Sequence, residues 1–191
     1  MNLGPTLLKH KLSHYDFGLP MELIAQKPTQ RRGQSRLLVV DRERQTLTHD
    51  TFGNLKNHLI NHPLMIFNDT RVIPAKLMVQ IGPNSKQVEI LLIRELEPGL
   101  WEVMMKGLSR LKPETTLKFE KSNLTAQFIS RHDSRAVIRF SSLEGLTAHL
   151  KESGRMPLPP YIKRPLSTNP QTLELDKKRY QTIFASHTGA I

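Results

Sequence analysis

The fold is decided by the stretch Gln87-Val88-Glu89-Ile90-Leu91-Leu92-Ile93-Arg94 and its neighbour Trp101-Glu102-Val103-Met104-Met105. Both are short runs rich in apolar residues, and the turn signal Pro98-Gly99 lies between them. Similar segments recur at a spacing of about 8–12 residues. The expected strands are Leu64–Phe67, Val72–Ile81, Gln87–Arg94, Trp101–Met105, Thr115–Phe119, Thr125–Ser130 and Ala136–Phe140. This pattern predicts an antiparallel barrel or a sandwich.

The residues before this block have a mixed pattern. Pro20–Gln26 has a proline suited to a first helical turn, and it predicts a short helix. Leu37–Val40 is typical of a buried strand, and we expect the chain to return as a hairpin through Thr46–His49. Apolar residues at 52, 55 and 59 then have helical spacing.

The residues after the block also favour helices. Leucines at 143, 146 and 150 predict an amphipathic helix, with Ser141 or Ser142 as its N-cap and Gly154 at its end. A further helix is expected over Leu173–Ala185. We therefore predict a discontinuous α/β domain made of residues 1–61 and 151–191, interrupted by an all-β barrel domain at 62–150. The flanks hold too few elements for a closed core, so the α/β domain is expected to be incomplete and the chain truncated at Ile191.

Composition excludes several classes of protein. The chain of 191 residues has no cysteine, which excludes disulfides, thiolate metal sites and radical chemistry at an iron–sulfur cluster. No apolar run approaches the about 20 residues that cross a bilayer, and residues 1–12 do not have the pattern of a signal peptide. We expect a cytoplasmic protein without a membrane partner. A net charge of +11 favours a polyanionic partner such as nucleic acid.

Two short strings can carry chemistry. Asn68-Asp69-Thr70 follows an apolar run and is by itself typical of an Asx turn. In a functional interpretation Asp69 accepts a proton, and Arg71 binds an anion. Pro157-Leu158-Pro159-Pro160 is extended and rigid; it either resembles a ligand of adaptor domains or forms a wall that positions Tyr161 and Arg164 against a base and its phosphates.

Other patterns are weaker. Arg31, Arg32 and Arg36 cluster, as do the basic residues 177–179, and each cluster is either a solvated face or a set of phosphate contacts. His58 and His62 lack the glutamate of a zinc-protease motif, so no metal site is predicted. The glycine-rich motifs of dinucleotide folds, P-loops and α/β-hydrolases do not occur.

Six ordered blocks together resemble the S-adenosylmethionine:tRNA ribosyltransferase-isomerase family of queuosine biosynthesis. The blocks are Leu19-Pro20 with Leu23-Ile24-Ala25-Gln26, Ser35-Arg36-Leu37-Leu38-Val39, Phe67-Asn68-Asp69-Thr70-Arg71-Val72-Ile73-Pro74-Ala75, Val88-Glu89-Ile90-Leu91-Leu92, Leu158-Pro159-Pro160-Tyr161-Ile162 and Arg179-Tyr180-Gln181-Thr182. The resemblance runs from about residue 12 to the last residue. It implies an α/β barrel-like domain interrupted by a β-barrel.

The resemblance also implies a reaction. S-adenosylmethionine is the ribosyl donor, and no prosthetic group or metal is implied. The acceptor is 7-aminomethyl-7-deazaguanine in tRNA, and the ribose rearranges to give epoxyqueuosine. The sulfonium acidifies the C5′ protons, so a base must remove one of them, and the departing adenine must be protonated. A monomer is expected.

Site residues follow from these demands. Asp69 is the first candidate base and Glu89 the second. Candidates for binding the donor or the base are Asn68, Arg71, Tyr161, Arg164, Tyr180 and Gln181. Candidates for contact with tRNA phosphates are Arg31, Arg36 and Lys163.

The sequence also departs from the family. Asn61-His62-Pro63 stands where the family has a Gly-Asp turn, and Lys76 replaces an expected arginine. The family's following Ala-Pro-Thr-Ala-Gly-Leu-His-Phe block is absent, so the chain alone is expected to be inactive. The alternatives are a non-catalytic, basic RNA-binding β-barrel module and, less favoured, an adaptor ligand.

Overall fold

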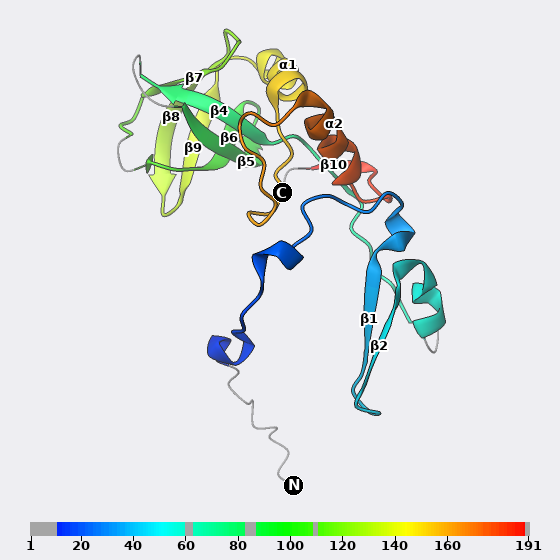
Figure 1. Cartoon of the computed structure of the whole chain (residues 1–191). Coiled ribbons are helices and arrows are strands. Elements are labelled where there is room, and N and C mark those ends of the chain that lie inside the picture. Colours follow the sequence, from blue (N-terminus) through cyan, green and yellow to red (C-terminus); the bar gives the residue numbers. More distant parts are fainter. Residues whose placement is uncertain (1–10, 60–62, 83–86, 109–110, 190–191) are drawn as a thin grey trace.

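The computed structural model describes residues 11–59, 63–82, 87–108 and 111–189. Figure 1 shows a barrel with two helices beside it, while a long hairpin and the N-terminal segment extend away from it. The described elements, with η for a 3₁₀ helix, are η1 (Leu12–Tyr15), η2 (Met21–Leu23), η3 (Arg32–Gln34), β1 (Arg36–Asp41), β2 (Thr46–Thr51), η4 (Phe52–His58), β3 (Thr70–Val72), β4 (Lys76–Ile81), β5 (Gln87–Glu97), β6 (Leu100–Met105), β7 (Thr116–Phe119), β8 (Thr125–His132), β9 (Arg135–Phe140), α1 (Leu143–Ser153), α2 (Pro170–Arg179) and β10 (His187–Gly189).

The strands β4 to β9 form a closed antiparallel barrel in the order β4-β5-β6-β9-β8-β7. Closure comes from β4, which pairs with β5 on one side, where Leu77 lies opposite Ile90. On its other side β4 pairs with β7, where Val79 lies opposite Phe119. A closed barrel leaves no unpaired strand edge. The predicted barrel is therefore confirmed.

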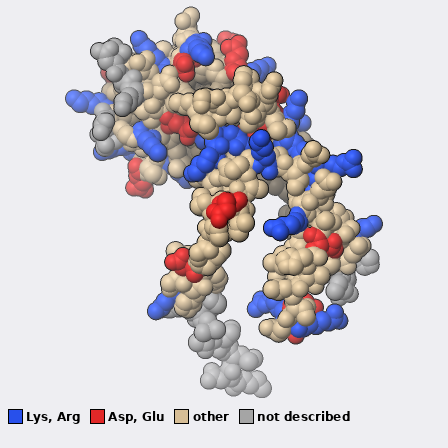
Figure 2. Space-filling model, in the orientation of Figure 1, with Lys and Arg blue, Asp and Glu red and all other residues tan. Residues whose placement is uncertain are grey.

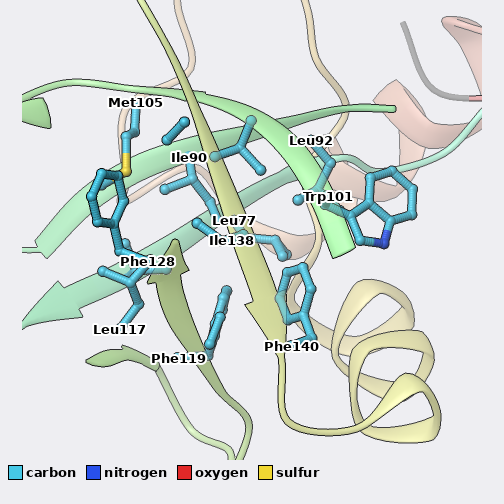
Figure 3. Close-up of a cluster of buried hydrophobic side chains, with 14 of the residues drawn as sticks. Leu77, Ile90, Leu92, Trp101, Met105, Leu117, Phe119, Phe128, Ile138 and Phe140 are labelled. Atoms are coloured by element: carbon cyan, nitrogen blue, oxygen red, sulfur yellow. The ribbon is translucent and has the colours of Figure 1, made fainter. Parts of the chain in front are cut away.

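The barrel interior is the main hydrophobic core (Figure 3). Alternate residues point inward, as in β7, where Leu117 and Phe119 are buried and their neighbours are exposed. Leu77, Ile90 and Ile138 lie at the centre of the cluster, and all three are at most 1% exposed. Burial of each such side chain contributes about 1.5–3 kcal/mol. The barrel is thus the part of the described chain that can hold its shape by its own packing.

One end of the barrel is covered by α1. The hydroxyl of Ser142 accepts a hydrogen bond from the amide of Gly145 at 3.0 Å, so Ser142 is the N-cap. Leu146 packs into the core cluster, and the ring of His149 lies edge-on to Phe119 with centroids 5.4 Å apart. The predicted helix and its N-cap are confirmed.

The chain enters and leaves the barrel at one place. The amide of Lys76 donates to the carbonyl of Arg155 at 3.2 Å, and the amide of Arg155 donates back at 2.9 Å. Gly154, the predicted end of α1, precedes this bridge. A side chain there would overlap the carbonyl oxygens of Leu150 and Pro74. A residue without Cβ is needed where these two crossings meet.

The predicted hairpin is confirmed as β1 and β2, which pair with Leu38 opposite His49 and Val40 opposite Leu47. The expected burial of Leu37–Val40 is wrong, because every residue of β1 is exposed or half-buried. The Asp41 carboxylate closes the turn by accepting from the next amides of the loop. Leu38, Val40 and Leu47 are each more than half exposed. One face of the hairpin is therefore apolar and uncovered by the described part of the chain.

Two of the expected strands are wrong. Leu64–Phe67 is no strand, because nothing in the described part of the chain pairs with it, and Leu64 and Ile66 are both 90% exposed. The strand expected over Val72–Ile81 is interrupted: β3 ends at Val72 and β4 begins at Lys76. Pro74 lies between them and has no N–H to donate to a ladder. As a result β3 leaves the barrel and pairs in parallel with β10.

Three expected helices differ from the prediction. Pro20–Gln26 contains only the short η2, and the segment around 52–59 is the 3₁₀ helix η4. The last helix, α2, begins and ends earlier than Leu173–Ala185. Its start is set by Asn169, whose side chain accepts from the amide of Thr172 at 2.8 Å and is followed by Pro170. The N-cap therefore sets where the helix begins, and the sparse apolar pattern does not.

Some sequence features lie outside the described residues, namely Asn61 and His62 of the departure from the family, and with His62 one member of the histidine pair. Within the described ranges, no helix has the length and apolar character needed to span a membrane.

Candidate active site

The first candidate site lies at the edge of the two-stranded parallel sheet. In β3 and β10, Thr70 lies opposite His187 and Arg71 opposite Thr188. The carbonyl of Asp69 accepts from the amides of Ser186 and His187 at 2.8 and 3.3 Å. This backbone pairing brings Asp69 against residues that are more than 110 positions away in the sequence.

The Asp69 carboxylate is held in its ionised form. Its Oδ2 lies 2.8 Å from Nδ1 of His187 and 3.4 Å from the hydroxyl of Ser186. The hydrogen bond from His187 is the main cause that lowers the pKa of Asp69 below its usual value, and Ser186 adds to it. The side chain remains 55% exposed. The carboxylate is thus charged and accessible at neutral pH.

Three predicted site residues support β3. The amide oxygen of Asn68 accepts from the amide of Thr70 at 2.8 Å, which confirms the Asx turn. Gln181 holds Val72 with two bonds, accepting from its amide at 2.9 Å and donating to its carbonyl at 2.7 Å. Arg71 is exposed and donates to the carbonyl of Ala185 at 3.3 Å. Asn68 and Gln181 therefore have structural bonds, while Arg71 is an exposed residue of β3 itself.

A second candidate site is a cavity of about 310 Å³ beside the C-terminal half of α2. Its walls are mostly apolar, and the tyrosines Tyr161 and Tyr180 both line it. Gln26 fixes the wall by donating to the carbonyl of Tyr161 at 2.9 Å and accepting from the amide of Lys163 at 2.8 Å. Two aromatic residues in an apolar cavity suit a flat ring.

Arg164 also lines this cavity, but its guanidinium is bonded to protein. It pairs with the buried Asp176 through Nε and Nη2, at 2.7 and 2.9 Å. This pairing raises the pKa of Arg164 above its ordinary value. Arg164 therefore anchors the segment that carries Tyr161, whether or not it also contacts a ligand.

The second candidate base lies elsewhere. Glu89 forms an ion pair with Lys76 at 3.2 Å on the barrel. It lines a smaller cavity of about 160 Å³ together with Lys163 and Arg164, and the lining of this cavity does not include Asp69. The structure brings Glu89 close to the basic residues after the proline segment, and it brings Asp69 to the β3–β10 edge.

Basic side chains gather below the barrel, where the N-terminal segment joins it (Figure 2). Arg31, Arg36 and Lys163 are all exposed. Two other arginines form a clasp between the N-terminal segment and α2. Arg32 donates to the carbonyls of Arg179 and Gln181, and Arg179 donates to those of Thr29 and Gln30.

Sequence reasoning missed His187, Ser186 and Asp176. His187 was one of eight scattered histidines, and its contact with Asp69 depends on strand pairing across 118 positions. Asp176 had no local signal either, because Glu174 precedes it on the same helix and only the contact with Arg164 sets the two acids apart. Within the described ranges, no group of three His, Asp or Glu side chains could hold a metal ion.

Comparison with known proteins identifies the family to which the chain belongs. A family model described as "Queuosine biosynthesis protein" matches residues 12–191, so the chain belongs to this family. The S-adenosylmethionine:tRNA ribosyltransferase-isomerase of Carboxydothermus hydrogenoformans is 39% identical over 180 residues, which are 94% of this chain and 51% of that protein. The enzyme of the same name from Desulforamulus reducens is 36% identical over 181 residues, with coverage of 94% and 51%.

The chain spans about half the length of the curated relatives it matches. Among solved structures, the S-adenosylmethionine tRNA ribosyltransferase of Thermotoga maritima is 31% identical, with a TM-score of 0.37 and coverage of 73% of this chain and 48% of that one.

Proposed function

We propose that this chain provides part of an S-adenosylmethionine:tRNA ribosyltransferase-isomerase. The reaction transfers the ribosyl group of S-adenosylmethionine to 7-aminomethyl-7-deazaguanine in tRNA and isomerises it to epoxyqueuosine. Family membership and the names of the relatives support this proposal. The observation that carries it is the ionised carboxylate of Asp69, which lies accessible beside His187.

The chemistry at this edge fits the first step of such a reaction. A proton must leave C5′ of the donor, and an accessible anion or imidazole can receive it. The exposed guanidinium of Arg71, which donates to the carbonyl of Ala185, suits the carboxylate of the methionine portion of the donor. Glu89 is the second candidate base, but its partner Lys76 occupies one of its oxygens.

The cavity beside α2 suits the bases. We assign Tyr161 and Tyr180 to stacking on adenine or on the tRNA base, because aromatic residues contribute about 1–3 kcal/mol per stacked base. Arg164 supports this wall through Asp176, and Gln181 and Asn68 support β3. No prosthetic group or metal is part of this proposal.

The tRNA backbone is the proposed partner of the exposed cations. Arg31, Arg36 and Lys163 neutralise phosphates, which adds affinity without base specificity. We further propose that the enzyme acts as a monomer in the cytoplasm.

We propose a domain organisation based on where the chain enters and leaves the barrel. Residues 1–61 and 151–191 belong to one discontinuous α/β barrel-like domain, and 62–150 is the inserted barrel domain. The bridge between Lys76 and Arg155 supports an inserted barrel, because it places the entry and the exit of the barrel side by side. Within 62–150, however, β3 pairs with β10 of the flanking domain and lies outside the barrel. The exposed apolar hairpin face and the two-stranded parallel sheet support an incomplete α/β domain, since parallel sheets are normally covered on both faces.

Adenine release from S-adenosylmethionine in the presence of substrate tRNA tests the function. The 191-residue chain alone is expected to release none. A chimera that joins this chain to the half of the Carboxydothermus protein that it does not match is expected to release adenine. The full Carboxydothermus protein is the positive control. Release by the chain alone would show that the other half is not required.

The same assay distinguishes the enzyme from the alternative function, a non-catalytic RNA-binding module. If the chimera binds tRNA but releases no adenine while the positive control does, the chain is a non-catalytic RNA-binding module. Asp69→Asn and Glu89→Gln in the chimera then rank the two carboxylates. We expect Asp69→Asn to lower the rate far more than Glu89→Gln, and equal rates would remove Asp69 from the site.

A further inference from the structure

The contact between Asp69 and His187 has a defined direction. An ionised carboxylate only accepts hydrogen bonds, so the nitrogen 2.8 Å from it must carry the proton. That nitrogen is Nδ1 of His187, and in the neutral ring the lone pair is then on Nε2. The part of the chain that the structure describes offers Nε2 no hydrogen-bond partner, and the side chain is 81% exposed. Nε2 is therefore a basic nitrogen that points to the outside.

The same contact weakens Asp69 as a base. Its pKa is lowered chiefly by the hydrogen bond from His187, and a weaker base takes a proton from carbon less readily. Nε2 of His187, by contrast, has its lone pair free of any hydrogen bond within the described residues and faces the outside. The imidazole is thus the better proton acceptor of the pair.

The arrangement is no hydrolase triad. In a Ser-His-Asp triad the serine contacts Nε2 and the acid contacts Nδ1. Here the Ser186 hydroxyl lies 2.9 Å from Nδ1, the same nitrogen that faces Asp69. Ser186 therefore shares the Asp69 side of the ring and leaves Nε2 for another molecule.

Two other His–Asp contacts in the described residues differ from the contact between His187 and Asp69. His58 faces Asp50 through Nε2, and Asp50 also accepts from Asn54 and from the amide of Thr51, which makes this contact a local cap. His132 touches its sequence neighbour Asp133 at the tip of a barrel hairpin, with both side chains about 90% exposed. Both contacts therefore join residues close in sequence, whereas the Asp69–His187 contact joins two strands that are 118 positions apart.

We propose that His187 is the proton-transfer residue of the site and that Asp69 positions it. This inference rests on the proposed function. The C5′–H bond of S-adenosylmethionine breaks, its proton goes to Nε2 of His187, and its electron pair stays on C5′ beside the sulfonium. The carboxylate of Asp69 stabilises the resulting imidazolium. The electron pair on C5′ then forms the C4′–C5′ double bond as the C4′–O4′ bond breaks, and the electrons on O4′ form a carbonyl at C1′. Adenine leaves C1′ with the electron pair of its glycosidic bond and takes the proton from the imidazolium.

The ring tautomer tests the geometry without any catalysis. In ¹⁵N NMR spectra of the 191-residue chain, neutral His187 is expected to carry its proton on Nδ1. Asp69→Asn is expected to shift the ring toward the Nε2–H form, which is favoured in water, while Ser186→Ala keeps the Nδ1–H form. His132→Gln is the matched control, because it removes an exposed histidine next to an aspartate. An Nε2–H tautomer in the unaltered chain would overturn the proposal.

Exchange of the C5′ hydrogens of S-adenosylmethionine with D₂O tests the proposed proton transfer. The protein used is the chimera of this chain with the remaining half of the Carboxydothermus protein. We expect His187→Gln to slow exchange by at least about 100-fold. Asp69→Asn is expected to slow it less and to alter its pH profile, which a purely structural role would not do. His132→Gln is expected to exchange normally. Unchanged exchange in His187→Gln overturns the assignment. A chimera that releases no adenine refutes the proposed function instead, and the tautomer of His187 then still tests whether Asp69 positions the ring.

Discussion

Arg164 and Asp176 form a two-point ion pair, with Nε–Oδ2 and Nη2–Oδ1 distances of 2.7 and 2.9 Å. Only 15% and 8% of their side chains are exposed. Arg164 also donates to the carbonyls of Gln26 and Lys163 at 3.0 Å. One guanidinium thus joins α2, the N-terminal segment and the segment after the prolines, which are the three walls of the tyrosine-lined cavity.

Removal of one partner of this pair is expected to destabilise the chain. Asp176→Asn leaves a buried guanidinium without its counter-charge, and the expected loss is about 3 kcal/mol of unfolding free energy. Arg164→Lys keeps the charge but loses the two-point geometry, so we expect a smaller loss. Urea denaturation followed by circular dichroism measures both. Glu174→Gln on the exposed face of α2 is the control, and equal stability of Asp176→Asn and this control would contradict the structural role.

Acid is expected to loosen the β1–β2 hairpin through Asp50. Hydrogen bonds from His58, Asn54 and Thr51 lower its pKa from 3.8 to about 2. Because the folded pKa lies below the unfolded value, the contribution of Asp50 is present above about pH 4 and is lost as the pH falls toward 2. Amide NMR signals of the hairpin should broaden or shift over this range.

Asp50→Asn is expected to lower hairpin protection at neutral pH and to flatten this acid response. Asp133→Asn serves as the control, because residue 133 has a φ of 53° that asparagine adopts readily. An Asp50→Asn chain with the acid response of the unaltered chain would refute the assignment.

His149 is expected to make the barrel end sensitive to mild acid. It is 3% exposed, and its Nδ1 has no hydrogen-bond partner among the described residues. Burial lowers its pKa below 6.5, although Glu152 and Glu120 oppose this shift. Since the unfolded chain binds the proton more readily, stability is full above about pH 6.5 and falls as the pH drops below it.

Replacing this histidine tests the point. His149→Phe removes the unpaired nitrogen and keeps a ring against Phe119, so we expect about 1 kcal/mol of added stability and a flatter dependence between pH 7 and 5. Thermal unfolding at several pH values measures both effects, and His132→Gln should leave them unchanged. An unaltered pH dependence in His149→Phe would show that another group titrates.

Binding of tRNA is expected to be strongly salt-dependent, because the chain carries a net charge of +11. Arg31→Gln, Arg36→Gln and Lys163→Gln should each reduce the slope of log affinity against log salt by about 1, if each meets one phosphate. Fluorescence anisotropy with labelled tRNA provides the measurement. Lys121→Gln, on a barrel turn, is the control, and equal slopes for all four variants would argue against these contacts.

Structural features that depend on interactions between residues close in sequence could be predicted from the sequence. The Asx turn at Asn68, the N-cap at Ser142 and the β1–β2 hairpin all depend on neighbours in sequence, and all were predicted. The barrel was predicted for the same reason, since alternation within each strand reflects its two faces. Leu64–Phe67 was mistaken for a strand because an apolar run carries no information about whether a pairing partner is present.

The sequence by itself therefore determined the family of this protein and its barrel, and it made Asp69 a candidate site residue. Only the tertiary structure decided what Asp69 contacts, because His187 reaches it through parallel pairing of β3 with β10. It also decided that Arg164 is held by Asp176 and Gln181 by Val72. Such contacts join residues whose distance in space is set by the path of the whole chain, and no local pattern of side chains encodes that path.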